Sequence, residues 1–179
     1  MFGGLMRILG IDPGLTRCGI GIIETDSRRR STFVHVAVIN TPIDSALPDR
    51  LWALEQDIET VLVTYQPDVV AIERVFSQHN VRTAMGTAQA SAVAMLSATR
   101  RHIPVSMYTP TEVKAAVTGS GRANKVQVTA MVTKLLNLAT PPKPADAADA
   151  LALALCHSWK GAGQQRLNDA IERAKVGHL

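Results

Sequence analysis

The mostly apolar run LMRILGID at residues 5–12 decides the fold, because it has the pattern of a short buried strand that ends in a carboxylate. Asp12 is followed by Pro-Gly, and Asp-Pro-Gly is typical of a tight turn. A second apolar run covers residues 18–25, and a third run with alternating hydrophobicity covers residues 32–41. Three strand patterns joined by short turns predict an antiparallel meander at the start of the chain.

Strand and helix patterns alternate over the rest of the chain. Buried strands are expected at 68–73 and 104–108, and helical periods at 48–65, 81–101, 111–117, 125–138 and 145–159. A meander followed by such an alternation predicts an α/β fold, in which helices cover the faces of one sheet. We expect a single domain over residues 1–160 and a polar, basic tail over residues 161–179.

The composition favours a folded domain. Of the 179 residues, 46% are hydrophobic and 19% are charged. A disordered chain is less hydrophobic and more highly charged, so this class is excluded. The sequence contains neither an apolar stretch of about 18 residues, as a membrane span requires, nor a signal-peptide pattern. Cys18 and Cys156 lie far apart and fit neither a disulfide framework nor a zinc site. We therefore expect a cytoplasmic protein without membrane association, and its net charge of +4 is compatible with a polyanionic partner.

Four acidic residues lie at the ends of apolar segments, where burial of a carboxylate is unfavourable in free energy. Asp12 ends the first strand and Glu73 ends the strand at 68–73. Burying a carboxylate without a partner costs several kcal/mol, so two such residues at one sheet edge need a shared reason. Asp146 and Asp149 begin the last apolar helix and project from one face of its first turn. If that face meets the strand edge, the four carboxylates converge.

Converging carboxylates repel one another unless cations lie between them. Oxygen ligands alone are what Mg²⁺ prefers, with Mn²⁺ as a substitute. Two such ions roughly 4 Å apart can stabilise the attacking and the leaving oxygens of phosphoryl transfer. The pattern therefore predicts a site for two Mg²⁺ ions, and the residues expected to be both metal ligands and catalytic are Asp12, Glu73, Asp146 and Asp149.

Each of these acids also has a structural interpretation when it is taken alone. Asp12 can be a turn residue, and Glu73 can pair with Arg74. Asp146 can cap its helix, and Asp149 suits a first turn because of the helix dipole. The conjunction of two strand-end acids with a pair three residues apart favours the metal site.

Three motifs in this order and spacing resemble those of the RuvC family of Holliday-junction resolvases: GIDPGLTRCGIGII (10–23), AIERVF (71–76) and DAADALALAL (146–155). The resemblance extends from about Arg7 to about His157. It implies a ribonuclease-H-like fold, which is a five-stranded mixed sheet flanked by helices, and it assigns catalysis to the same four acids. It also implies a homodimer and partnership with a RuvA–RuvB branch-migration complex.

The activity that the resemblance implies is metal-dependent hydrolysis of four-way junction DNA during recombination and repair. Paired symmetric nicks would leave 5′-phosphate and 3′-hydroxyl ends, without a covalent intermediate. In the family, an aromatic residue at the position of Phe76 stacks on bases beside the cut site, and lysines at those of Lys114 and Lys125 lie near the scissile strand. The residues expected to contact DNA are Arg74, Phe76, Gln78, Arg82, Lys114, Arg122 and Lys125.

Other functions fit parts of the same sequence. An RNA-processing nuclease of the same fold would use the same acids. An ATP-binding domain of the actin and sugar-kinase type carries a D-x-G-x-T loop like residues 12–16, but that fold needs two lobes and this chain is too short for them. A junction-binding protein without activity has no use for a buried negative cluster that repels phosphate, so the four acids speak against it.

Overall fold

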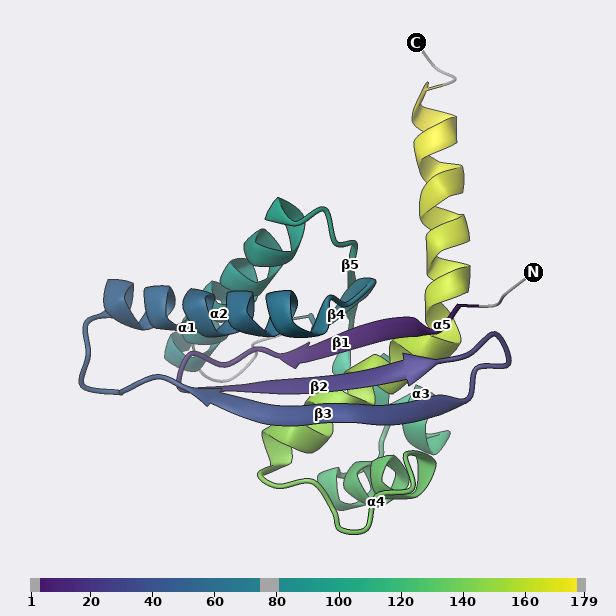
Figure 1. Cartoon of the computed structure of the whole chain (residues 1–179), viewed down its shortest axis with the longest axis horizontal. Helices are drawn as coiled ribbons and strands as arrows, with labels where there is room; N and C mark the ends of the chain where they lie inside the picture. Colours follow the sequence, from purple (N-terminus) through teal and green to yellow (C-terminus); the bar gives the residue numbers. More distant parts are fainter. Residues whose placement is uncertain (1–3, 75–80, 177–179) are drawn as a thin grey trace.

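The computed structural model describes residues 4–74 and 81–176, and over these residues the chain forms a five-stranded mixed sheet (Figure 1). Its order is β3-β2-β1-β4-β5. The strands are β1 (Met6–Asp12), β2 (Arg17–Thr25), β3 (Ser31–Asn40), β4 (Val69–Glu73) and β5 (Val105–Tyr108). β1, β2 and β3 are antiparallel neighbours, whereas β4 is parallel to both β1 and β5. The predicted α/β fold and its opening meander are confirmed.

Helices cover both faces of this sheet (Figure 1). They are α1 (Leu47–Tyr65), α2 (Val81–Arg100), α3 (Pro110–Thr118), α4 (Lys125–Leu135) and α5 (Ala145–Val176). Side chains of a strand alternate between the two faces, so Ile8 packs with α3, α4 and α5, whereas Leu9 and Ile11 pack with α1 and α2. The sheet therefore separates two apolar cores.

Two helix ends differ from the sequence-based prediction. α5 was expected to end at residue 159, but it continues to Val176 and projects beyond the sheet (Figure 1). Gly161 and Gly163 favour an end there, yet a glycine costs a helix only about 1 kcal/mol relative to alanine. α4 ends earlier than predicted, at Leu135, because Asn137 adopts a left-handed φ of 50°. No helix of the described residues has the length and hydropathy to cross a membrane.

The backbone of α5 lies directly on β1 and β2, because the strands carry glycine where the helix crosses them. A methyl group at Gly10 would overlap the carbonyl oxygen of Ala150, and one at Gly19 would overlap the carbonyl oxygen of Asp146. Any side chain at either position would push the helix away from the sheet. These glycines therefore determine where the first turn of α5 lies.

Both cysteines are buried inside this arrangement. Cys18 lies in β2 and Cys156 in α5, and neither forms a disulfide. Burial raises the pKa of the Cys18 thiol to about 12 and that of Cys156 to about 11. Both side chains therefore remain protonated thiols at neutral pH.

Candidate active site

Two of the predicted acids lie at the carboxyl ends of adjacent parallel strands. Ile11 of β1 pairs with Ile72 of β4, so Asp12 and Glu73 follow at the same edge of the sheet. Both side chains are partly buried because they directly follow the fully buried part of their strands. The β1–β4 register thus places two carboxylates side by side.

Asp146 and Asp149 reach this edge from the first turn of α5. Asp12 pairs with Gly19 across the antiparallel ladder, and the backbone of Asp146 lies on that same Gly19. Asp149 follows one helical turn later, and both acids are partly buried. The close packing of α5 on glycine therefore brings the helix acids to the strand acids.

Burial and the neighbouring acids perturb the ionisation of Asp12 and Glu73. Burial raises the pKa of Asp12 to about 8, and the charges of Glu73, Asp149 and Asp146 contribute to this increase. Burial also raises the pKa of Glu73, and Asp149 adds to it. A cation among these groups would favour their ionised forms.

Two basic side chains lie against the helix acids. Lys125 Nζ donates to Asp149 Oδ2 at 2.9 Å, and this hydrogen bond raises the lysine pKa. Arg17 Nε lies 3.1 Å from Asp146 Oδ2. That pair lacks hydrogen-bond geometry, so Asp146 Oδ2 is a buried oxygen without a hydrogen-bond partner. Buried polar atoms of this kind normally have a partner, and a metal ion is one that a carboxylate accepts.

The donor set fits a hard divalent cation in its chemistry. All of its candidate ligands are carboxylate oxygens, one of which is buried and unsatisfied. Within residues 4–74 and 81–176, however, no three Asp, Glu, His or Cys side chains are already gathered in a metal-binding arrangement. Lys125 and Arg17 hold Asp149 and Asp146 in ion pairs instead. Binding of an ion would therefore require these carboxylates to exchange an ammonium or guanidinium group for the metal.

The residues predicted to contact DNA differ in how the structure relates them to the four acids. Lys114 of α3 lies close enough to Glu73 for its charge to lower the pKa of that carboxyl, and Lys125 pairs with Asp149. Arg74 and Arg122 are exposed. Phe76 and Gln78 lie outside the described residues, as does the side chain of Arg82 at the start of α2. The structure therefore brings the two lysines to the acids.

Arg17 beside the acids was not predicted from the sequence. It is the first residue of β2, and the short turn after β1 returns it to the sheet edge where β1 ends. The signal that could have identified it is the tightness of the Asp-Pro-Gly turn, which leaves the start of β2 little freedom.

A five-stranded sheet in this order, with carboxylates at the ends of β1 and β4 and on a helix packed against them, defines the class of ribonuclease-H-like proteins. The family model for crossover junction endodeoxyribonuclease RuvC matches residues 8–157. The chain therefore belongs to the RuvC family, whose members are metal-dependent nucleases.

Individual relatives agree with this assignment. Crossover junction endodeoxyribonuclease RuvC of Streptomyces avermitilis is 65% identical over 166 residues, which is 93% of this chain and 94% of the relative. The Salinispora arenicola protein of the same name is 59% identical over 172 residues, covering 96% and 98%.

Solved structures give the same result. Thermus thermophilus RuvC in complex with a Holliday junction substrate has a TM-score of 0.82 at 31% identity, over 87% of this chain and 94% of that one. The yeast mitochondrial resolvase Ydc2 shares the fold, with a TM-score of 0.64 at 13% identity over 94% of this chain and 86% of that one. The predicted ribonuclease-H-like fold is thereby confirmed.

Proposed function

We propose that this chain is a Holliday-junction resolvase, which makes paired symmetric nicks in four-way DNA junctions during recombination and repair. The observation that carries the proposal is the meeting of Asp12, Glu73, Asp146 and Asp149 at one sheet edge. The solved complex of the Thermus thermophilus relative with a Holliday junction supports the choice of substrate.

The four acids would hold two Mg²⁺ ions, with Mn²⁺ as a substitute. When bound, such ions supply Lewis-acid stabilisation of the phosphate and lower the pKa of water. Asp146 Oδ2 is buried without a hydrogen bond, so it could accept an ion once Arg17 gives up its ion pair with this oxygen. Asp12 holds a proton up to about pH 8 in the metal-free chain and must release it to become a ligand. Cleavage would leave 5′-phosphate and 3′-hydroxyl ends.

Basic side chains around the acids would neutralise the DNA backbone. Lys125 reaches Asp149 and is otherwise exposed, so a phosphate can replace this carboxylate as its partner. Lys114 lies near Glu73, and Arg74 directly follows that acid; Arg74 and Arg122 are both exposed. Phe76, Gln78 and Arg82 complete the proposed contacts, in which Phe76 would stack on junction bases.

The remaining parts of the proposal concern assembly and organisation. A homodimer suits a four-way junction, because two-fold symmetry would relate two active sites to two scissile phosphates. Family membership supports partnership with a RuvA–RuvB complex and a cytoplasmic location. The nuclease domain would comprise residues 1–160, with residues 161–179 as a basic tail. Sedimentation at micromolar concentration tests the dimer, and a monomer alone would contradict it.

The decisive experiment is cleavage of an end-labelled synthetic four-way junction by wild type and Asp149→Asn. We expect paired symmetric nicks that require Mg²⁺, disappear in EDTA and are lost in the variant. Asp57→Asn is the matched control, because Asp57 is an exposed acid on α1 and its loss should leave cleavage unchanged. Nicking in EDTA, or full activity of Asp149→Asn, would contradict the proposal. Preferential cutting of RNA substrates would instead favour an RNA-processing nuclease.

A further inference from the structure

A groove of about 780 Å³ opens beside the active site and extends along the N-terminal half of α2. One wall is formed by the turn between β1 and β2 and by the segment leading into α1. The other wall is the side of α2 that carries Met85 and Gln89. Asp146 is among the lining residues, so the groove is continuous with the catalytic acids. Of the predicted DNA contacts whose side chains the structure describes, none lines it.

Arg50 is the most firmly held charge in this groove. Its Nε donates to Thr41 Oγ1 at 3.0 Å, and its Nη2 donates to Thr16 Oγ1 at 2.9 Å. Thr41 is buried, and its own hydroxyl donates to the carbonyl of Leu15, so its oxygen is fixed as an acceptor. These hydroxyls fix the orientation of the guanidinium, which keeps further N–H donors for a ligand.

The charge of Arg50 is not compensated. Its two partners are neutral hydroxyls, and among the described residues no carboxylate lies within ion-pair distance of it. By contrast, Arg7, Arg30, Arg100 and Arg101 each pair with a carboxylate. A preoriented guanidinium without an anionic partner is suited to a phosphate.

Arg17 supplies a second positive charge between Arg50 and the acids. Its side chain is 60% exposed, and it contacts Asp146 Oδ2 without forming a hydrogen bond. Because this pair is exposed on the arginine side, it is worth little in free energy. A phosphate can therefore replace Asp146 as the partner of the Arg17 guanidinium at a small cost in free energy. The Asp146 oxygen would then be available to a cation.

The opposite wall, formed by α2, presents both polar and apolar side chains, which suit a nucleotide chain. Thr87 and Gln89 of α2 line the groove together with the exposed Met85, whereas the exposed Ile43 belongs to the wall of Arg50. The guanidinium groups would contact phosphates, while Met85 on the opposite wall would contact sugars and bases.

We propose that this groove binds the backbone of the DNA strand that leads into the active site, with Arg50 and Arg17 as ligands of successive phosphates. The inference rests on the proposed function only in taking DNA as the ligand. Arg50 is a binding residue here, and its hydroxyl partners Thr16 and Thr41 keep it in position.

The test is the salt dependence of binding to an uncleaved four-way junction in EDTA. Fluorescence anisotropy gives the Kd over a range of KCl concentrations for wild type, Arg50→Gln, Arg50→Lys and Arg17→Gln. We expect Arg50→Gln and Arg17→Gln each to reduce the slope of log Kd against log [KCl] by about 1 and to weaken binding roughly tenfold. Arg50→Lys keeps the charge, so its slope should remain that of wild type. Arg101→Gln is the charge-matched control outside the groove and should also keep that slope.

Two outcomes would overturn the inference. One is a wild-type slope in both Gln variants, with thermal melts showing that they are folded. The other is an equal loss of affinity at all salt concentrations, which would mean that Arg50 only supports the β1–β2 turn. If Arg50→Gln does not fold, Arg17→Gln alone decides between the same outcomes. Wild-type cleavage is measured separately, so failure to cut would contradict the proposed function without affecting the count of phosphate contacts.

Discussion

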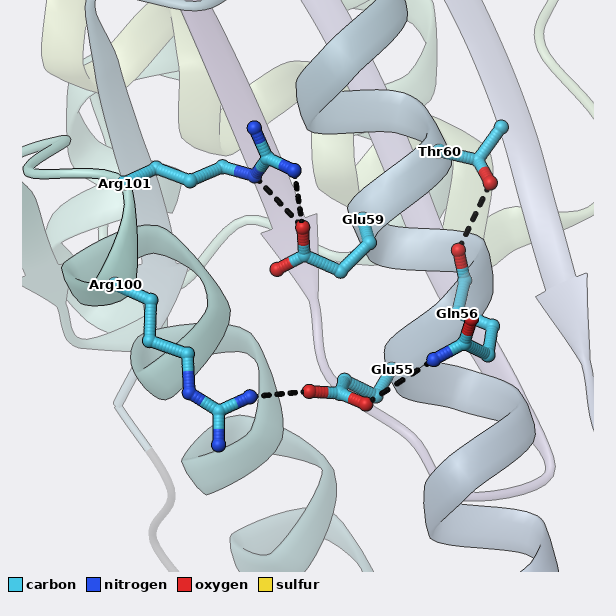
Figure 2. Close-up of polar contacts among 6 residues, drawn as sticks. All are labelled: Glu55, Gln56, Glu59, Thr60, Arg100 and Arg101. Carbon is cyan, nitrogen blue, oxygen red and sulfur yellow. Dashed lines mark hydrogen bonds and ion pairs between the residues drawn. The ribbon is translucent and has the colours of Figure 1, made fainter.

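The two faces of the sheet are packed in different ways. On one face, the backbone of α5 rests on strand glycines such as Gly10 and Gly19. On the other, α1 and α2 pack through side chains, with Leu54 and Ile58 of α1 fully buried. Two ion pairs lie at their outer surface: Glu55 of α1 pairs with Arg100 at the end of α2, and Glu59 of α1 pairs with Arg101, the residue after it (Figure 2).

This difference separates the part of the molecule that positions the chemistry from the part that mainly stabilises it. Contact between backbones contains no rotatable side chain that could adapt, so the position of Asp146 follows directly from that of Gly19. Aliphatic side chains can repack when one of them is changed, at a cost in stability. We therefore expect changes on the α5 face to impair cleavage, and changes in the apolar core between the sheet and α1 and α2 to affect stability alone.

The largest expected effect is that of Gly19→Ala. The added methyl group would overlap the backbone of Asp146, so α5 has to move. We expect about 3 kcal/mol lower stability in urea unfolding and roughly 100-fold slower junction cleavage by the folded protein. Gly86→Ala in α2 is the control, because its nearest neighbour would be Leu15 Cβ at 3.5 Å, an ordinary contact. That variant should be as stable as wild type or up to about 1 kcal/mol more stable. Wild-type behaviour of Gly19→Ala would refute the comparison.

The next effect tests the opposite face. Leu54→Ala removes a fully buried side chain from the α1–α2 core and should lower the free energy of unfolding by roughly 2–4 kcal/mol. Cleavage per folded molecule should stay within about twofold of wild type. The free energy is obtained from urea unfolding and the rate from junction cleavage at a temperature where the variant is folded. A large loss of cleavage would show that this face also positions the acids.

A smaller effect is expected from pH, and it concerns the α5 face alone. The pKa of Asp12 is about 8 in the folded chain and near its ordinary value of 3.8 when unfolded. Between these values the folded chain binds more protons at Asp12 than the unfolded chain does, so metal-free stability must fall as the pH rises. We expect the thermal midpoint in EDTA to be lower at pH 8 than at pH 5 by several degrees.

The control for this pH effect is Asp12→Asn, which should lose most of the dependence. Mg²⁺ should also raise the midpoint more at pH 8 than at pH 5, because the ionised carboxylate is the ligand. A midpoint that rises in EDTA between pH 5 and pH 8 would contradict the assigned ionisation of Asp12.

The smallest effect is expected at the outer surface of α1 and α2. Arg101→Gln breaks the pair with Glu59, whose atoms lie 2.6 Å apart between two partly exposed side chains (Figure 2). Exposed pairs contribute at most about 1 kcal/mol, so the loss in urea unfolding should not exceed this amount. High salt should remove the difference between wild type and variant. A loss well above 1 kcal/mol would mean that these helices depend on charge rather than on their apolar core.

Most of the fold could be predicted because its signals are local. The Asp-Pro-Gly turn after Asp12 marks the first strand end, and the alternating and helical periods mark the rest. The strand-end positions of Asp12 and Glu73 likewise followed from the sequence, since parallel neighbours end at the same edge. The C-terminal end of α5 did not follow, because Gly161 and Gly163 weaken a helix without ending it.

The parts of the site that depend on tertiary contacts could not be predicted from residue patterns. A glycine in a strand indicates either a bulge or a close approach of backbone, and only the crossing of α5 shows which applies at Gly10 and Gly19. Arg17 and Arg50 are ordinary surface arginines in the sequence. Their roles depend on contacts that form only in the folded chain, between Arg17 and Asp146 and between Arg50 and Thr16.

The buried thiols of Cys18 and Cys156 make this chain convenient for fluorescence work. Maleimide reagents attack thiolates, and neither cysteine supplies an accessible one at neutral pH. A cysteine introduced at an exposed position such as Asp44 would therefore be the preferred site of labelling, without removal of the native pair. Energy transfer from a dye at that position to labelled junction arms would allow the opening of single DNA molecules to be followed in real time.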